Sequence, residues 1–353
     1  MKAINESKNI IFLFFIILII TACDGTSDQE KEPVVEGTTF VMDTVVNVKL
    51  FSGGSNTVLE VMFDKLDEID QLMSLEYETS DVSQININAG IKPVIISDYT
   101  KHVIEESIKF SELSEGYFDI SFGPLISLWS INSEQTKIPS KDEIDYALSL
   151  ASYASIMINE NEVELNDENM SIDLGGIAKG YAADIIADIA VDSGVTSGII
   201  NIGGNILVIG AKVDEKKSTF SIGIQNPFAI RNGYLGIVNV EDSTIVTSGN
   251  YERYFELDGV RYHHILDKDT GYPVNNGIAA VSIVTKNSLD ADALSTIVYI
   301  LGLTKGMELI ESLEGSECLF VNNEHEIFLS SGMKDLFVLT DKKFNIIEMK
   351  GAQ

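Results

Sequence analysis

The stretch from 171 to 205, SIDLGGIAKGYAADIIADIAVDSGVTSGIINIGGN, places the strongest constraint on how this chain folds. It contains two glycine pairs, Gly175-Gly176 near its start and Gly203-Gly204 near its end. Between the pairs, an alanine-rich amphipathic run predicts a helix, and an apolar strand follows it. Glycine pairs allow positive φ angles and let backbone N–H groups approach a ligand closely. We therefore expect two tight glycine turns that bracket one helix and one strand.

Two charged residues flank the first glycine pair. Asp173 precedes the pair and Lys179 follows it, so a carboxylate and an ammonium group frame the N-terminus of the predicted helix, where anions are stabilised. This arrangement is typical of a cradle for a phosphate or a dinucleotide. The spacing matches neither G-x-G-x-x-G nor G-x-x-x-x-G-K-[ST], and two ordinary turns between strands and helices explain the glycines equally well.

The charge balance limits the possible ligands. The 353 residues include 24 Lys and Arg against 54 Asp and Glu, which gives a formal net charge of −30. Such a field repels nucleic acid and polyphosphate chains, so we expect no nucleic-acid partner. A small anionic cofactor needs local compensation, either from Lys179 or from a divalent cation.

The N-terminus resembles that of an exported lipoprotein. Lys2 and Lys8 precede an apolar run over 10–20, which is too short to span a bilayer and resembles the hydrophobic part of a secretory signal. The run leads into Thr21-Ala22-Cys23, and small residues directly before a cysteine resemble the lipobox of bacterial lipoproteins. An ordinary signal peptide with an incidental cysteine is the alternative.

These features predict three segments. Residues 1–22 are expected to be a lipoprotein signal peptide, 23–38 a lipidated Cys23 with a polar tether, and 39–353 the functional domain. The mature protein is then expected at the cell membrane, lipid-anchored on the extracytoplasmic face. The other cysteine, Cys318, lies in an apolar strand-like run and is expected to be a small buried hydrophobic residue.

Periodicity predicts further helices and strands along the chain. The predicted helices cover 56–73, 97–114, a segment beginning at Lys141, and 287–302. The predicted strands cover 39–51, a hairpin over 156–165, 220–227, 235–240 and 317–322. Periodicity alone selects no topology for these elements.

The helix predicted over 287–302 carries Asp292 and Thr296 one turn apart on the same face. A carboxylate and a hydroxyl are hard oxygen ligands suited to Mg²⁺. A capped or back-bonded helix start would contain the same pair. Where the pair converges with the glycine turns and Lys179, the three features describe a clamp for Mg²⁺ and a pyrophosphate.

Aromatic and histidine residues add further candidates. Tyr117-Phe118-Asp119 indicates a pocket wall, although core packing with a capping aspartate explains it nearly as well. Met42 is by itself most simply a core side chain. His263 and His264 are neighbours on an extended segment, so they point to opposite faces and at most one of them faces a site.

Separate blocks of the chain resemble, in order, the ApbE family of FAD:protein FMN transferases, over about 39–339. The blocks are Met42-Asp43-Thr44, 80–86, 116–119 with 123–125, 173–180, 201–204, Thr247-Ser248-Gly249, 264–267 with Thr270-Gly271, and 291–296. Their shared order, behind a lipobox, carries the resemblance.

The resemblance implies an α+β fold with mixed sheets, in which two α/β subdomains are intertwined around an FAD site. It implies Mg²⁺-dependent transfer of FMN from FAD, the substrate, to a Thr or Ser hydroxyl of an exported or membrane-attached acceptor protein, with release of AMP. The implied flavin-binding residues are Met42, Tyr77, Tyr117, Phe118, Asp119, Asp173, Lys179, His264 and Ile265.

The resemblance also implies the metal ligands and a catalytic residue. Asp292, Thr296 and the backbone carbonyl of Gly176 would bind Mg²⁺, and His264 would take part in the transfer step. A histidine with an ordinary pKa of about 6.5 is suited to act as general base for the acceptor hydroxyl. The alternative is that His264 only orients a phosphate.

The chain departs from the family pattern at two positions. Asp43 stands in a motif that is often Met-Gly-Thr, and Asp269 replaces the cation of Asp-Pro-Arg-Thr-Gly. Two other function classes stay open at this stage. One is an FAD pyrophosphatase that produces FMN and AMP, and the other is a non-enzymatic flavin-binding lipoprotein.

Overall fold

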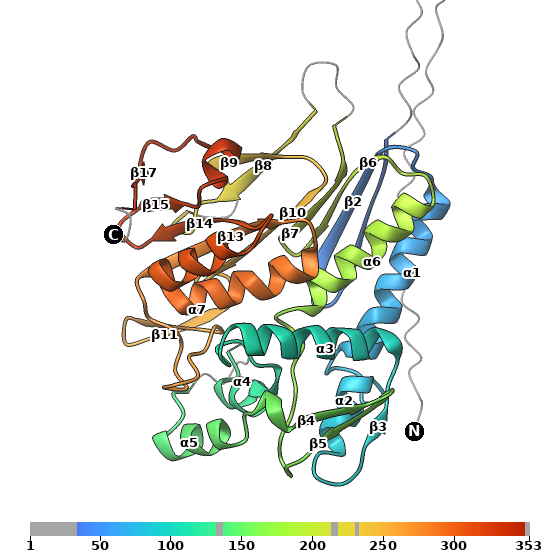
Figure 1. Ribbon diagram of the computed structural model, residues 1–353, viewed down its shortest axis with the longest axis vertical. Coiled ribbons are helices and arrows are strands. Elements are labelled where there is room, and N and C mark those ends of the chain that lie inside the picture. The colour runs from blue at the N-terminus through green and yellow to red at the C-terminus, as the bar shows by residue number, and fades with distance from the viewer. Residues whose placement is uncertain (1–33, 132–136, 213–217, 230–232, 350–353) are drawn as a thin grey trace, which may run out of the picture. The chain divides into compact units, whose positions relative to one another are not determined.

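A mixed sheet of nine strands runs through the described part of the chain (Figure 1). Its strands, in spatial order, are β1 (Val35–Val41), β2 (Thr44–Ser52), β6 (Ser197–Ile202), β7 (Asn205–Gly210), β10 (Ser243–Gly249), β13 (Ile278–Thr285), β14 (Glu317–Asn322), β15 (Glu326–Leu329) and β17 (Asn345–Ile346). Neighbouring strands are antiparallel except β15 and β17, which are parallel. The computed structural model describes residues 34–131, 137–212, 218–229 and 233–349.

Three helices cover one face of this sheet: α1 (Asn56–Met73), α6 (Ala178–Asp192) and α7 (Ser288–Ser312). Their apolar side chains and those of the sheet form the largest hydrophobic cluster. Helix α7 is long and apolar enough to cross a membrane. However, its first turns are almost fully buried against β10 and β13, as in the core helix of a globular domain. Its helical geometry breaks at Gly302, where φ is 74°.

A smaller sheet covers the other face. It contains β8 (Phe220–Gln225), β9 (Tyr234–Val240) and β16 (Phe337–Leu339), accompanied by the short helix α8 (Met333–Leu336). Side chains of the large sheet alternate between the two layers. Leu207 belongs to the helix-side cluster and Val208 to the cluster under the small sheet. The two-residue period of a strand therefore builds both cores at once.

The segment between α1 and α6 folds around a second small sheet. Its elements are α2 (Asp81–Ile87), β3 (Val94–Ile95), α3 (Asp98–Leu113), α4 (Gly123–Trp129), α5 (Lys141–Ser149), β4 (Ile156–Asn159) and β5 (Glu162–Leu165), with 3₁₀ turns at Ile120–Phe122 and Tyr153–Ser155. Serine side chains cap α2, α3 and α5 at Ser80, Ser97 and Ser140. A separate hairpin, β11 (Tyr254–Leu257) and β12 (Val260–His263), leads into the predicted histidine.

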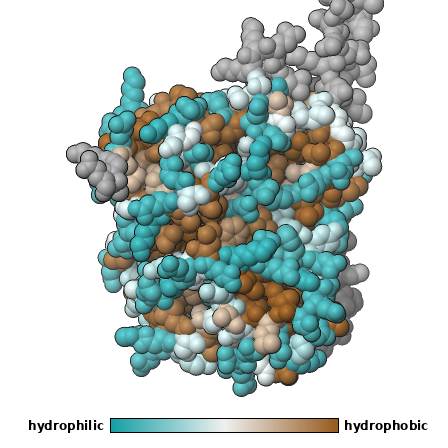
Figure 2. Space-filling view, in the orientation of Figure 1, coloured by the Kyte–Doolittle hydropathy of each residue, from teal (hydrophilic) through white to brown (hydrophobic). Residues whose placement is uncertain are grey.

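The α+β class with mixed sheets is confirmed. The helix predicted over 56–73 has the same bounds as α1, and those predicted over 97–114 and from Lys141 correspond to α3 and α5. On the face shown in Figure 2, hydrophilic side chains interrupt the hydrophobic areas, in keeping with the high charge of the chain.

The prediction of one strand over 39–51 is wrong. Two strands form instead, because Met42 and Asp43 have φ angles of 54° and 56° and make a two-residue turn between β1 and β2. The β-structure also begins earlier than predicted, since β1 starts at Val35, inside the segment expected to be a tether. The predicted signal peptide and Cys23 lie outside the described residues.

Candidate functional site

The turn before α6 is built by side-chain and backbone hydrogen bonds. The Asp173 carboxylate accepts a hydrogen bond from the Gly175 N–H at 2.7 Å, and the Asp173 N–H donates to the Ile120 carbonyl at 2.8 Å. Gly175 and Gly176 do not have positive φ, so this part of the expectation is wrong. Gly176 is instead needed for close packing, because a Cβ there would lie 3.2 Å from the ring of Phe118.

Helices α6 and α7 meet directly behind this turn. The Asp292 carboxylate of α7 accepts a hydrogen bond from the Gly180 N–H, in the first turn of α6, at 2.9 Å. In return, the Asp184 carboxylate of α6 accepts from the N–H groups of Ser288 and Leu289, at the start of α7, at 2.7 and 2.8 Å. Each helix therefore supplies a carboxylate to the positive end of the other.

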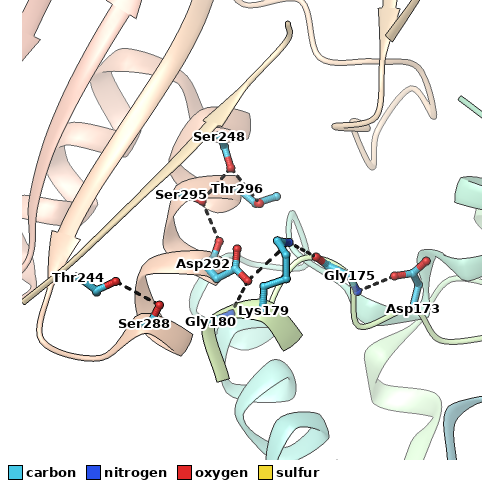
Figure 3. Close-up of polar contacts among 10 residues, drawn as sticks. All are labelled: Asp173, Gly175, Lys179, Gly180, Thr244, Ser248, Ser288, Asp292, Ser295 and Thr296. Atoms are coloured by element: carbon cyan, nitrogen blue, oxygen red, sulfur yellow. Dashed lines mark hydrogen bonds and ion pairs between the residues drawn. The ribbon is translucent and has the colours of Figure 1, made fainter. Parts of the chain in front are cut away.

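Lys179 joins the two predicted halves of the clamp. Its ammonium donates to the Gly175 carbonyl at 3.0 Å and lies 3.9 Å from Oδ2 of Asp292 (Figure 3). The Asp292 side chain is 7% exposed and the Lys179 side chain 25%, so the carboxylate lies at the bottom of the site and the ammonium nearer its opening. The structure thus brings Asp292, which is far away in the sequence, to Lys179 at the turn that Asp173 shapes.

Hydroxyl groups line the α7 side of the site. Ser248 of β10 lies 2.7 Å from the Ser295 hydroxyl and 3.5 Å from that of Thr296, and Ser295 donates to the Asp292 carbonyl at 2.9 Å (Figure 3). Thr296 therefore faces the same side of α7 as Asp292. The sequence analysis named Ser248 within one of the blocks of the family resemblance but gave it no role, and its position between a threonine and a glycine was the available signal.

The donor set suits a hard divalent cation. Asp292 offers a carboxylate, Thr296 a hydroxyl and Gly176 a backbone carbonyl, which are oxygen ligands of the kind that Mg²⁺ prefers. Among the described residues, no group of three or more His, Cys, Asp or Glu side chains could hold a metal by itself. A cation at this place would therefore depend on ligands from the substrate, as is usual for Mg²⁺ bound to phosphates.

Met42 and Tyr77 form a second group through Asp70. The Met42 N–H and the Tyr77 hydroxyl, the latter at 3.4 Å, both donate to the Asp70 carboxylate. Desolvation raises the pKa of Asp70, and the nearby Asp70 charge raises the pKa of Tyr77. Sequence reasoning missed Asp70, because its role arises only where the turn at Met42 reaches the end of α1.

The turn at Met42 packs against the second glycine pair. Gly203 and Gly204 have φ angles of 58° and 105° and connect β6 to β7 in a two-residue hairpin, as expected for this pair. A Cβ at Gly203 would lie 2.4 Å from the Thr44 hydroxyl. Only glycine therefore lets these two turns approach each other.

The aromatic segment contributes a wall and an anchor. Phe118 is buried against Gly176, whereas the Asp119 carboxylate accepts hydrogen bonds from the N–H groups of Ser121 and Tyr153. Asp119 therefore caps the 3₁₀ turn at Ile120–Phe122, which was the alternative to a role in a pocket wall. Desolvation raises its pKa despite these hydrogen bonds.

Tyr117 links this wall to the segment after His264. Its hydroxyl donates to Asp269 at 2.9 Å, which raises the pKa of Tyr117, and the Lys268 ammonium lies 4.4 Å from the centre of its ring. Lys268 also donates to the Glu115 carbonyl at 2.9 Å. Asp269, which stands in place of the expected cation, therefore binds the Tyr117 hydroxyl. The neighbouring Lys268 supplies a positive charge beside the same ring.

The two histidines face different surroundings. His263 is 4% exposed, and its Nε2 lies 2.8 Å from the Val274 carbonyl, which makes it a structural side chain. His264 is solvent-exposed, and its Nδ1 lies 3.3 Å from the Arg253 carbonyl. Since a carbonyl can only accept, Nδ1 carries the proton in the neutral ring and Nε2 is left as the basic atom. The neighbouring Ile265 is buried.

The surroundings of His264 keep its ring neutral. Desolvation by the adjacent protein walls is the largest cause that lowers its pKa, to about 4, and the charges of Arg253 and Lys179 act in the same direction. The ring nonetheless remains accessible to solvent. A neutral, accessible imidazole is available at pH 7 to accept a proton.

The larger of two described cavities lies elsewhere. It has a volume of about 700 Å³ and lies between α3, α6 and the start of α7. Five carboxylates line it, from Glu106, Asp184, Asp188, Asp242 and Asp290, and it includes none of the predicted site residues. Such a lining repels phosphate groups, so the cavity is unsuited to a phosphate ligand in spite of its size.

The sequence pattern of the ApbE family matches residues 42–320, most of the described chain. The chain belongs to the ApbE family. It is 31% identical over 349 residues to the FAD:protein FMN transferase of Treponema pallidum, covering 94% of this chain and 96% of that protein. It is 32% identical to the protein of the same name from Klebsiella pneumoniae, covering 87% and 95%.

Solved structures of ApbE proteins share the fold. The ApbE protein of Thermotoga maritima is 32% identical and has a TM-score of 0.79, with 86% of this chain and 99% of that chain covered. The flavin transferase ApbE from Vibrio cholerae is 27% identical with a TM-score of 0.77 and the same coverage. The α+β arrangement described above is therefore that of ApbE flavin transferases.

A substitution at Gly180 tests the contact between α6 and α7. Helix propensity alone predicts that Gly180→Ala stabilises the protein by about 1 kcal/mol. However, the added Cβ would lie 2.2 Å from the Ser288 carbonyl oxygen and 2.8 Å from Cβ of Asp292. We therefore expect Gly180→Ala to lower the stability by about 1–3 kcal/mol, measured as a lower urea midpoint.

Asp188→Ala is the matched control, because Asp188 lies on the exposed side of the same helix. This substitution should leave the urea midpoint unchanged or raise it slightly. A Gly180→Ala protein that is more stable than the wild type would contradict the close approach of the two helices.

Proposed function

We propose that this protein transfers FMN from FAD to a Thr or Ser hydroxyl of an acceptor protein in a Mg²⁺-dependent reaction that releases AMP. Membership of the ApbE family and the names of its relatives support flavin transfer. One observation carries the proposal on the structural side: Lys179 and Asp292, from two different helices, meet at the glycine turn before α6. A cation and a carboxylate at a helix N-terminus suit a pyrophosphate with its metal.

The clamp residues have distinct roles in this proposal. Asp292, Thr296 and the Gly176 carbonyl would hold Mg²⁺, which when bound would neutralise the pyrophosphate and the AMP leaving group. Lys179 contacts the phosphate oxygens. Asp173 keeps the glycine turn in shape through its hydrogen bond to Gly175, so that this turn faces the pyrophosphate.

The flavin half of FAD would lie against the remaining candidates. Phe118 and Tyr117 would form one wall for the flavin. Met42 and Tyr77, which are joined through Asp70, would supply a second apolar and aromatic contact. Tyr77 is 38% exposed, as expected of a side chain that awaits a ligand. Ile265 is buried directly after His264 and supports that segment from behind.

His264 acts as the general base. Its unprotonated Nε2 takes the proton from the acceptor hydroxyl, and the hydroxyl oxygen then forms a bond to the phosphorus on the FMN side. The bond from that phosphorus to the bridging oxygen breaks, and AMP leaves with this oxygen. The product is FMN joined to the acceptor by a phosphoester bond.

The same site would perform hydrolysis if water replaced the acceptor hydroxyl, and the solvent exposure of His264 favours this as a second candidate activity. The purified domain can be incubated with FAD, Mg²⁺ and an acceptor protein and then run on a denaturing gel. Flavin fluorescence that migrates with the acceptor supports transfer. FMN and AMP without labelled acceptor indicate a pyrophosphatase, and intact FAD indicates a flavin-binding protein without enzymatic activity.

Removal of the charged metal ligand tests the clamp. Asp292→Ala should lower the rate of FMN transfer at least about a hundredfold, because a bound metal contributes several kcal/mol to such reactions. EDTA should have a comparable effect on the wild type. The measurement is the initial rate of acceptor labelling with saturating FAD.

Asp290→Ala is the matched control on the same helix. Asp290 contacts Asn287 and lines the acidic cavity, so its removal should change the rate less than about twofold. Equal losses at the two positions would contradict the assignment of Asp292 as the ligand.

The proposed base predicts a pH dependence. Because desolvation lowers the pKa of His264, the ring stays neutral as the pH falls through 6.5 and transfer should decline only near the lowered pKa of about 4. His264→Ala should retain FAD while losing about a hundredfold or more in rate, and its rate should rise with pH as solvent base replaces the imidazole.

His263→Ala should mainly reduce thermal stability, since His263 is buried, and should lower transfer much less at temperatures where it is folded. A His264→Ala protein that no longer binds FAD would assign His264 to cofactor positioning rather than proton transfer.

We further propose that Cys23 anchors the protein to the membrane on the extracytoplasmic face, so that its acceptor is another exported or membrane-attached protein. Cys23→Ser should block lipidation and ordinary lipoprotein processing, which is measured as an increase in the mass of the protein by an uncleaved signal peptide. A truncated protein beginning at Val34 retains all of β1 and should keep full FAD binding and transfer. A truncated protein that folds but does not label a soluble acceptor would show that the tether contributes to the site.

A further inference from the structure

Lys179 contacts Asp292, the charged ligand that a divalent cation would use, and a backbone carbonyl next to the one assigned to the metal. Its ammonium donates to the Gly175 carbonyl at 3.0 Å and lies 3.9 Å from Oδ2 of Asp292. Figure 3 draws the ammonium between these two groups, with Asp292 pointing toward α6. Gly175 adjoins the carbonyl assigned to the metal, and Asp292 is the charged ligand. The lysine ammonium therefore lies beside the charged ligand proposed for the metal, where a divalent cation would meet a like charge.

We propose that the Lys179 ammonium competes with the metal for Asp292. In this proposal Lys179 pairs with Asp292 and weakens metal binding when no FAD is bound, and FAD binding removes this competition. This inference rests on the proposed function and describes how that site is regulated. A lysine can change partners because its ammonium lies on a flexible four-carbon stem. When the pyrophosphate enters, its oxygens become the stronger partner, and Asp292 is released for the metal.

The formal charges explain why the two ligands should bind together. Asp292 and Lys179 sum to zero, so a divalent cation without a nucleotide would bring the site to +2. A pyrophosphate with two negative charges returns that sum to zero. Because Asp292 is nearly buried, water screens these charges poorly and the repulsion between the metal and the lysine is strong. Metal and FAD are therefore expected to bind with positive coupling.

The experiment measures Mn²⁺ binding by electron paramagnetic resonance of the free ion, with the full protein and no FAD. Lys179→Met keeps the length of the side chain but removes its charge, and it should bind Mn²⁺ at least about tenfold more tightly than the wild type. Lys179→Gln serves as a second variant if Lys179→Met does not fold. Titration with FAD, followed by flavin fluorescence, should show weaker FAD binding for both variants.

Lys49→Met is the matched control. Lys49 lies on β2 and pairs with Glu36 at the surface, so this variant has the same net charge as Lys179→Met and leaves the site intact. It should bind Mn²⁺ as the wild type does. A Lys179→Met protein that binds Mn²⁺ no more tightly than Lys49→Met would overturn the proposal.

A double variant separates this inference from the proposed function. Adding Asp292→Ala to Lys179→Met should abolish the gain in Mn²⁺ affinity. A gain that persists would place the ion elsewhere, and would overturn both the competition of Lys179 with the metal and the assignment of Asp292 as a metal ligand. Failure of flavin transfer itself would be seen separately, as an unlabelled acceptor in the gel assay of the wild type.

Discussion

The reciprocal capping of α6 and α7 is the interaction on which the site depends. Asp184 of α6 accepts the first N–H groups of α7, and Asp292 of α7 accepts an N–H of the first turn of α6. Desolvation raises the pKa of Asp184 to about 6, so the two N–H groups at the start of α7 offset the cost of burying this carboxylate only in part. Gly180 allows the approach, because no Cβ intervenes. The contact fixes Asp292 relative to the glycine turn.

The contact between α6 and α7 places the positive charge of Lys179 at the turn before α6, in a protein that is otherwise strongly acidic. The chain carries a net charge of −30, and five carboxylates line its larger described cavity. An anionic nucleotide is repelled by most of such a molecule. At the turn before α6, however, the helix N-terminus and Lys179 both favour a phosphate. Local structure therefore overrides net charge in selecting the place where an anion binds.

The aromatic wall illustrates how a departure from the family pattern is accommodated. Asp269 stands where ApbE relatives often have a cation, and it accepts a hydrogen bond from the Tyr117 hydroxyl. Lys268 lies beside the same ring and donates to the Glu115 carbonyl. The pair ties the turn before Phe118 to the segment that carries His264. One wall of the proposed flavin pocket is thereby connected to the proposed base.

The sequence by itself determined the local features whose causes are local. The 3.6-residue spacing of apolar residues identified α1 with the observed bounds, and it located α3 and the start of α5. The order of motif blocks indicated the family and with it Asp292, Thr296 and Lys179. The strand over 39–51 was misjudged, because β-branched residues on both sides of a turn read as one continuous strand.

Only the tertiary structure decided which of these features meet. Whether Lys179 pairs with Asp292, whether Asp119 caps a turn, and which histidine is accessible all depend on contacts between residues far apart in the chain. The pKa values of Asp184 and His264 are likewise set by desolvation, which no local pattern encodes. Periodicity reports the face that a residue occupies, whereas the partner across that face is fixed only when the chain packs.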